Sequence, residues 1–132
     1  MEVIYEGSLR TRAIHLSSGA VIMTDAPVDN QGRGEAFSPT DLASASLASC
    51  MLTILGILAS AHHFNIDGTK AEVTKVMASD PRRIAGISVR LIFPQSHTLN
   101  QKQQEMIKRA ALTCPVALSL SPEVQQEITF CF

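Results

Sequence analysis

Two cysteines, Cys50 and Cys114, stand in sequence surroundings that suit thiol chemistry. Cys50 follows residues 43–49, which are mostly small and would let a substrate approach the sulfur closely. Cys114 precedes Pro115, a residue favoured in the first turn of a helix, and a helix N-terminus stabilises a thiolate. Each could also be inert, Cys50 as a core residue and Cys114 as an ordinary helix-start residue. The third cysteine, Cys131, falls in a predicted strand and is interpreted as structural.

The sequence carries no pattern typical of a metal or nucleotide site. Zinc sites usually need Cys and His at short, repeated spacings, and the chain has no CxxC pair. His62 and His63 are adjacent, so on a helix they point in different directions and are interpreted as helix-terminal residues. No GxSxG, P-loop or dinucleotide motif occurs, and the Gly32–Gly34 segment is too short to cradle a phosphate. We therefore expect no bound metal and no cofactor.

The composition predicts a globular protein with one domain, residues 1–132. Apolar residues make up 45% and charged residues 17%, and 11 basic against 12 acidic side chains give a net charge of −1. No basic run exceeds two residues, so neither nucleic acid nor a membrane surface is an expected partner. The first residues lack a secretory-signal pattern, and three cysteines suit a reducing compartment better than a disulfide scaffold. We expect the chain to be cytoplasmic.

One long segment without charges, residues 42–61, must position Cys50. Its length would allow it to cross a membrane, but it contains many Ser, Thr and Ala residues, and no Lys or Arg flanks it. A helix buried in protein on most sides is the preferred interpretation. Ser38 is expected as its N-cap and Pro39 as its first residue, and the helix is expected to end near His62 or His63.

The other elements follow from alternating apolar residues and from turn residues. The expected strands cover residues 2–15, 20–24, 70–78, 84–93 and 127–132, and the further helices cover residues 99–112 and a short segment from Cys114. The order β-β-α-β-β-α-α-β indicates an α+β fold with a long buried central helix. Because that helix is apolar all round and one small sheet covers one side, the sequence predicts a homodimer that buries the other side.

Three stretches of the sequence resemble the OsmC/Ohr family of osmotically inducible proteins and organic hydroperoxide resistance proteins. The run GEAFSPTDLASASLASCM, from Gly34 to Met51, resembles the family's central helix, in which a Pro at the start and small residues lead to a Cys. The segment Thr113–Val116 resembles its second motif, Cys-Pro at a helix start. Tyr5–Gly7, with the basic residues after it and the turn Ser17–Gly19, resembles its N-terminal hairpin. The match spans nearly the whole chain. The sequence resembles the OsmC-like branch of the family more than the dedicated hydroperoxide reductases.

The resemblance implies an intertwined homodimer, in which sheets from both subunits wrap the two long helices and two active sites lie at the interface. It also implies thiol-dependent reduction of organic hydroperoxides, and of hydrogen peroxide, in oxidative stress defence. Cys50 would attack the peroxide and become a sulfenic acid, and Cys114 would then form a disulfide with Cys50. An external dithiol would restore both thiols.

The thiolate of Cys50 requires a cation close by, because burial disfavours the charged form of a thiol. The family's arginine comes from the N-terminal hairpin, so Arg10 and Arg12 are the candidates. Arg10 fits the family spacing slightly better. Both could instead be solvated strand residues.

One position departs from the family pattern. Family peroxidases carry a Glu ten residues before the first Cys, and that Glu holds the arginine, whereas this chain has Thr40 there. Glu35 or Asp41 could substitute for it. Glu35 is preferred, because Asp41 can be occupied at the positive end of the helix dipole.

Two further functions are compatible with the sequence. The missing Glu at position 40 favours a non-catalytic binding module, which would hold a small apolar ligand in the dimer cleft with Cys50 as a spectator. The other hypothesis is a structural or interaction domain with inert thiols.

Overall fold

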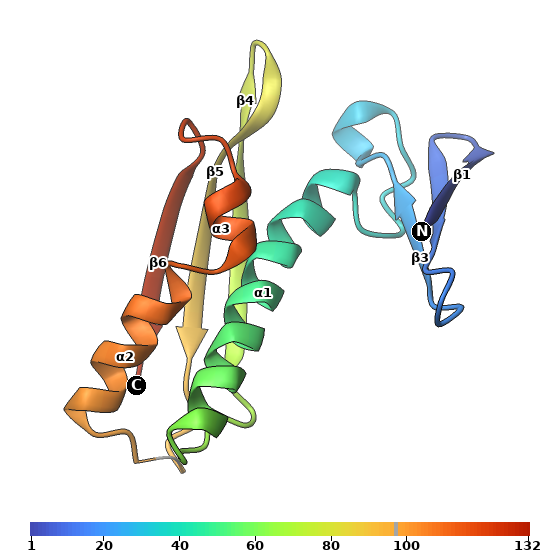
Figure 1. Cartoon of the computed structure of the whole chain (residues 1–132). Coiled ribbons are helices and arrows are strands. Elements are labelled where there is room, and N and C mark those ends of the chain that lie inside the picture. The colour runs from blue at the N-terminus through green and yellow to red at the C-terminus, as the bar shows by residue number, and fades with distance from the viewer. Residues whose placement is uncertain (97) are drawn as a thin grey trace. The chain divides into compact units, whose positions relative to one another are not determined.

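The computed structural model describes residues 1–96 and 98–132. The chain forms two compact units, Met1–Ala43 and Ser44–Phe132, and each is described by itself. The elements in chain order are β1 (Glu2–Gly7), β2 (Arg10–Ile14), β3 (Val21–Asp25), the 3₁₀ turn η1 (Val28–Asn30), α1 (Pro39–Ala61), β4 (Lys70–Ser79), β5 (Arg82–Ile92), α2 (Gln101–Ala111), α3 (Pro115–Ser119) and β6 (Gln125–Cys131). The predicted α+β class is confirmed, with one more strand than expected (Figure 1).

The first unit contains a three-stranded antiparallel sheet of order β1-β2-β3. The prediction of one extended segment over residues 2–15 is wrong, because Ser8 and Leu9 reverse the chain with φ values of 51° and 60°. Gly7, with φ of 86°, and Ser8 are residue types that often mark a turn, whereas Leu9 seldom adopts positive φ and gives no such signal. The Tyr5 hydroxyl accepts a hydrogen bond from the Leu9 backbone N–H at 3.3 Å. The predicted hairpin through Ser17–Gly19 is confirmed as the β2–β3 pair.

Helix α1 begins at Pro39, as predicted, and a reciprocal cap fixes its start. The Asp41 backbone N–H donates to the Ser38 hydroxyl at 3.1 Å, and the Asp41 carboxylate accepts the Ser38 backbone N–H at 2.8 Å. Two donors that a helix start would leave unpaired are thereby satisfied. The helix ends at Ala61, slightly before the predicted end, and His63 follows in the left-handed conformation with φ of 55°.

The second unit is built on a sheet of order β4-β5-β6. The β4–β5 pair is the predicted hairpin, and β6 joins β5 in the parallel direction. Alternation along β5 places Ile87, Val89 and Leu91 on one face, where each is at most 1% exposed. Helices α1, α2 and α3 contribute to the same buried cluster and lie over this face (Figure 1).

One side of α1 supplies much of that core. Leu47, Met51 and Leu55 are fully buried, and Ile107 of α2 lies in the same cluster. By length and composition alone α1 could cross a membrane, but such a helix is also typical of a protein core. Ile57, on the other hand, is 62% exposed, so part of the apolar surface of α1 is left uncovered by the described residues of the unit Ser44–Phe132.

The segment that carries Cys114 is shaped by two helix caps. Asn100 and Gln103 form a capping box at the start of α2, each side chain accepting the other's backbone N–H. The shorter helix α3 begins with Pro115 and has Cys114 as its N-cap residue. Cys114 is 0% exposed, so this turn places its sulfur in the core.

Candidate active site

The two predicted thiols meet inside the unit Ser44–Phe132. Cys50 lies in the middle of α1, half-buried and packed against the hydrophobic core, and Cys114 is fully buried at the start of α3. Cys50 packs against the buried cluster that includes Cys114, and it is near enough to raise the pKa of the Cys114 thiol. Both cysteines are reduced. The structure therefore brings two cysteines from distant parts of the sequence into one hydrophobic cluster.

The ionisation of Cys114 is governed by burial. Desolvation raises the pKa of the Cys114 thiol above its ordinary value, and the neighbouring Cys50 raises it further. The Ala117 backbone N–H donates to the sulfur at 3.4 Å and acts in the opposite direction. The expected stabilisation of the thiolate by the helix start is thus outweighed, and Cys114 is a neutral thiol near pH 7.

This balance predicts the pH at which Cys114 becomes reactive. In a Cys50→Ser, Cys131→Ser variant, alkylation of Cys114 by iodoacetamide should stay slow through neutral pH and accelerate only above pH 9.0, its ordinary pKa. The thiolate is the reacting form, and a raised pKa moves its formation to higher pH. Mass spectrometry of quenched samples measures the rate, with the same variant unfolded in urea as the control. Half-maximal alkylation in the folded protein at or below the pH seen in urea would contradict the assignment.

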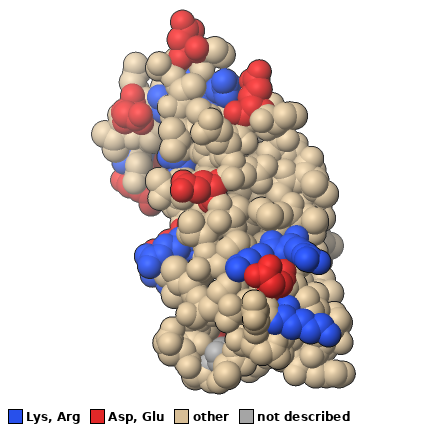
Figure 2. Space-filling model, turned by 90° about the vertical axis from the view of Figure 1, so that its left-hand side faces the viewer, with Lys and Arg blue, Asp and Glu red and all other residues tan. Residues whose placement is uncertain are grey.

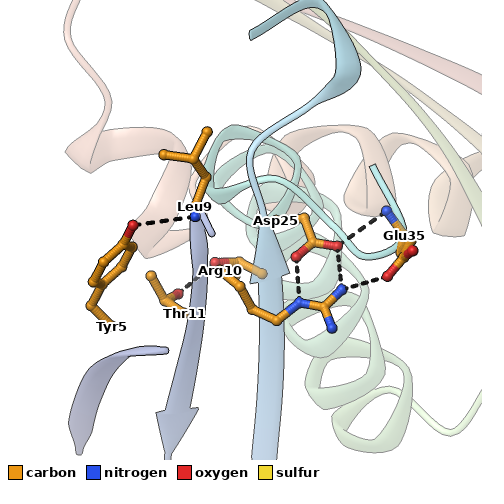
Figure 3. A network of polar contacts seen from close by, with 7 residues as sticks. Tyr5, Leu9, Arg10, Thr11, Asp25 and Glu35 are labelled. Atoms are coloured by element: carbon orange, nitrogen blue, oxygen red, sulfur yellow. Dashed lines mark hydrogen bonds and ion pairs between the residues drawn. The ribbon is translucent and has the colours of Figure 1, made fainter. Parts of the chain in front are cut away.

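A second group of candidate residues surrounds Arg10 within the unit Met1–Ala43 (Figure 3). Arg10 Nε and Nη2 donate to the two carboxylate oxygens of Asp25 at 2.6 and 2.8 Å. Arg10 Nη2 also donates to Glu35 Oε2 at 2.8 Å. The Asp25 side chain is 1% exposed, whereas that of Glu35 is 63% exposed. One guanidinium is therefore held by a buried and by an exposed carboxylate.

The charges in this group reinforce one another. The hydrogen bond from Arg10 holds the pKa of the Asp25 carboxyl below its usual range, although burial acts in the opposite direction. The backbone N–H of Glu35 and the charge of Arg33 lower the pKa of Asp25 further. The hydrogen bonds to Asp25 and Glu35 raise the pKa of Arg10, which therefore remains a cation.

The remaining candidates have other partners. Arg12 Nε donates to Glu6 Oε1 at 2.5 Å, a contact separate from the Arg10 group. Asp41 binds Ser38 at the start of α1, as expected for a carboxylate at the helix dipole. The Ser38 and Thr40 hydroxyls are hydrogen-bonded at 3.1 Å. Of the two carboxylates considered in place of the family Glu, it is thus Glu35 that pairs with Arg10.

Sequence reasoning missed Asp25, the most buried member of the Arg10 group. The signal that could have found it was the register of the predicted hairpin. With the turn at Ser17–Gly19, Ile14 pairs with Val21 and Arg10 pairs with Asp25 across the β2–β3 ladder. Opposite charges directly across an antiparallel pair contact each other readily.

The third cysteine, Cys131, is the last residue of β6. Arg90 Nε donates to Cys131 Sγ at 3.4 Å, and Arg90 Nη1 contacts Glu72 at 3.4 Å. Figure 2 shows basic side chains next to acidic ones at several places on the face in view.

A shallow groove of about 520 Å³ runs between α1 and β4 in the second unit. Small and apolar residues line it: Ala45, Ala48, Ser49, Leu52, Thr53, Ala71 and Val73. The small side chains near Cys50 that were noted in the sequence thus produce a hollow on the surface of this unit.

Comparison with known proteins gives consistent results. The family model described as OsmC-like protein matches residues 32–129. A Psychrobacter arcticus 273-4 structure, described as an osmotic stress induced and detoxification response protein, is 56% identical with a TM-score of 0.93, covering 98% of this chain and 93% of that one. The organic hydroperoxide resistance protein OsmC of Legionella pneumophila is 16% identical with a TM-score of 0.78, covering 99% and 96%. OhrB of Bacillus subtilis, an organic hydroperoxide resistance protein, is 16% identical with a TM-score of 0.66, covering 98% and 96%. The search of curated proteins found no match.

Proposed function

The chain belongs to the OsmC-like protein family, and we propose that it is a thiol-dependent peroxidase that reduces organic hydroperoxides. The observation that carries the proposal is that Cys50 packs against the hydrophobic cluster of Ser44–Phe132 in which Cys114 is buried. Two free thiols that come into contact can form a disulfide, and a disulfide is the product expected when one of them reacts with a peroxide. The Legionella and Bacillus relatives are named as organic hydroperoxide resistance proteins, which supports the same substrate class.

In the first step, the thiolate of Cys50 attacks the terminal oxygen of the hydroperoxide. The O–O bond breaks, the alcohol leaves after taking up a proton, and Cys50 becomes a sulfenic acid. Hydrogen peroxide would react in the same way and release water. Cys50 is the preferred nucleophile because it is only half-buried, whereas Cys114 is fully buried and its pKa is raised.

In the second step, Cys114 attacks the oxidised sulfur of Cys50. The S–O bond breaks, the hydroxyl group leaves as water, and a disulfide forms. A negatively charged Cys50 helps to keep Cys114 protonated, since the charge of Cys50 contributes to the raised pKa of Cys114.

The cycle closes when an external dithiol exchanges with the disulfide. Two electrons pass from the dithiol to the protein, the dithiol becomes a disulfide, and both cysteines return to thiols. We propose no cofactor and no metal for any step.

Arg10 is the proposed cation that stabilises the thiolate of Cys50 and the developing charge on the peroxide. Asp25 and Glu35 keep it ordered and charged, whereas Arg12 pairs with Glu6 instead. The feature that favoured a ligand-binding module was the absence of a Glu at position 40. This absence no longer favours a ligand-binding module, because two other carboxylates bind Arg10.

The direct test is consumption of hydroperoxide by the purified protein. With cumene hydroperoxide or tert-butyl hydroperoxide and excess dithiothreitol, we expect many turnovers per chain, measured as loss of peroxide. Mass spectrometry of protein treated with peroxide in the absence of a reductant should find a Cys50–Cys114 disulfide. The absence of turnover with every hydroperoxide tried would remove the proposal.

We also propose that the active form is a homodimer. Ile57 of α1 is 62% exposed in a single chain, and the groove between α1 and β4 is lined by small residues that allow close packing. Light scattering should give twice the 14.2 kDa of one chain. Ile57→Lys should shift the mass toward the monomer, whereas Leu112→Lys, at a position 55% exposed after α2, should leave it unchanged. A wild-type mass of one chain at micromolar concentration would contradict the homodimer.

A further inference from the structure

Asp25 binds Arg10 by a two-point contact that no other residue of the group makes. The Asp25 carboxylate accepts hydrogen bonds from Arg10 Nε at 2.6 Å and from Nη2 at 2.8 Å. The two residues are paired across β2 and β3. A paired contact of this kind fixes the plane of a guanidinium as well as its position. Because Asp25 is 1% exposed, its carboxylate is confined by the surrounding protein.

Glu35 depends on the same carboxylate for its own placement. Its side chain touches Arg10 through one oxygen at 2.8 Å and is 63% exposed. Its backbone N–H donates to Asp25 Oδ2 at 3.1 Å, and the Asp25 backbone N–H donates to the Phe37 carbonyl at 3.1 Å. Asp25 thus holds both the loop that carries Glu35 and the arginine that Glu35 binds.

These contacts leave one edge of the guanidinium available. An arginine side chain has five N–H donors, of which Arg10 uses the one on Nε and the two on Nη2. Within residues 1–96 and 98–132, Nη1 makes no hydrogen bond. Two donors in a fixed direction suit an anionic sulfur or oxygen.

We propose that Asp25 is the positioning residue for Arg10 in the peroxidase reaction, taking the place of the carboxylate that position 40 lacks. The inference rests on the proposed function of Arg10. Asp25 fixes the plane of the guanidinium, so that the two N–H groups of Nη1 point in one direction for a thiolate or a peroxide oxygen. Asp25 acts through Arg10 and touches no reacting atom, and Glu35 adds a weaker second contact.

The first test is the NMR signal of the Arg10 Nε–H in ¹⁵N-labelled protein, assigned by its loss in Arg10→Gln. A proton donated to a buried carboxylate should exchange slowly with water. Asp25→Asn should shift this signal and speed its exchange, while Glu35→Gln should preserve it. Glu6→Gln is the matched control, because Glu6 pairs with Arg12 in the same sheet. If the Arg10 signal in the wild type exchanges as fast as the signals of exposed arginines, the proposal fails, whether or not the variants fold.

The second test is a double-mutant cycle on hydroperoxide reduction. Asp25→Asn should lower kcat/KM about 100-fold, the order of loss expected from a misplaced catalytic group. Arg10→Gln should lower it at least as much, and the double variant should be no worse than Arg10→Gln alone. A purely structural role would instead give losses that multiply, and that result would overturn the proposal.

The two proposals can fail separately. A wild-type protein that reduces no hydroperoxide would remove the proposed function, while the Nε–H measurement would still decide whether Asp25 orients Arg10. Turnover in the wild type that survives Asp25→Asn unchanged, in a folded variant, would remove the role of Asp25 and leave the peroxidase standing.

Discussion

Replacing Cys50 with serine is expected to reduce hydroperoxide turnover by at least about 1,000-fold, to the rate of the reductant alone. The serine hydroxyl is not ionised near neutral pH, so the nucleophile is lost while the side chain keeps nearly the same size. Because Cys50 is half-buried in the middle of α1, the helix and its core contacts should tolerate the change. Peroxide consumption with tert-butyl hydroperoxide and dithiothreitol measures the effect, with circular dichroism as the check on folding.

Cys131→Ser is the matched control for that experiment. Cys131 is a half-buried cysteine of the same unit, lies in β6 and contacts Arg90. Its replacement should leave turnover unchanged. If Cys131→Ser removes activity and Cys50→Ser does not, the nucleophile has been assigned to the wrong sulfur.

Replacing Cys114 should stop the catalytic cycle after Cys50 has been oxidised to the sulfenic acid. With Cys114→Ala, each chain should consume one equivalent of hydroperoxide rapidly and then accumulate sulfenic acid on Cys50, because the partner for the disulfide is gone. Dimedone labelling followed by peptide mass spectrometry locates the sulfenic acid, and stopped-flow measurement of peroxide loss gives the stoichiometry. Alanine is chosen because it removes the nucleophilic group from this position, which is 0% exposed, without putting another hydrogen-bonding group in its place.

Two results would contradict this role for Cys114. One is unimpaired multiple turnover in Cys114→Ala with a dithiol at low concentration, since resolution would then not need a second protein thiol. The other is a stable sulfenic acid on Cys50 in the wild type, because adjacent Cys114 should trap it as a disulfide.

The long central helix could be predicted from the sequence because its signals are local. Ser38, Pro39 and Asp41 define its start through contacts within four residues, and the structure has the helix begin there. The second hairpin, the capped helix α2 and the turn before α3 follow from equally local patterns. Such features depend on neighbouring residues along the chain, so they can be predicted without knowledge of the tertiary fold.

The features that were not predicted have three different causes: an unusual local turn, the register of a hairpin, and the packing of distant segments. The turn at Ser8 and Leu9 uses residues that are uncommon at positive φ. Asp25 was overlooked because its importance arises only from the register that sets it opposite Arg10. The presence of Cys50 and Cys114 in one hydrophobic cluster requires α1 and α3 to pack against the same sheet, which no spacing in the sequence encodes.

The burial of Cys114 also determines how a reductant would have to approach the oxidised protein. A dithiol can attack only the sulfur it reaches, and Cys50 is half-exposed while Cys114 is shielded. Attack at Cys50 makes Cys114 the leaving thiolate, and a thiol of raised pKa leaves slowly. We therefore expect a small dithiol to regenerate the protein faster than a monothiol such as glutathione. The second thiol of the dithiol can attack the mixed disulfide and release Cys50.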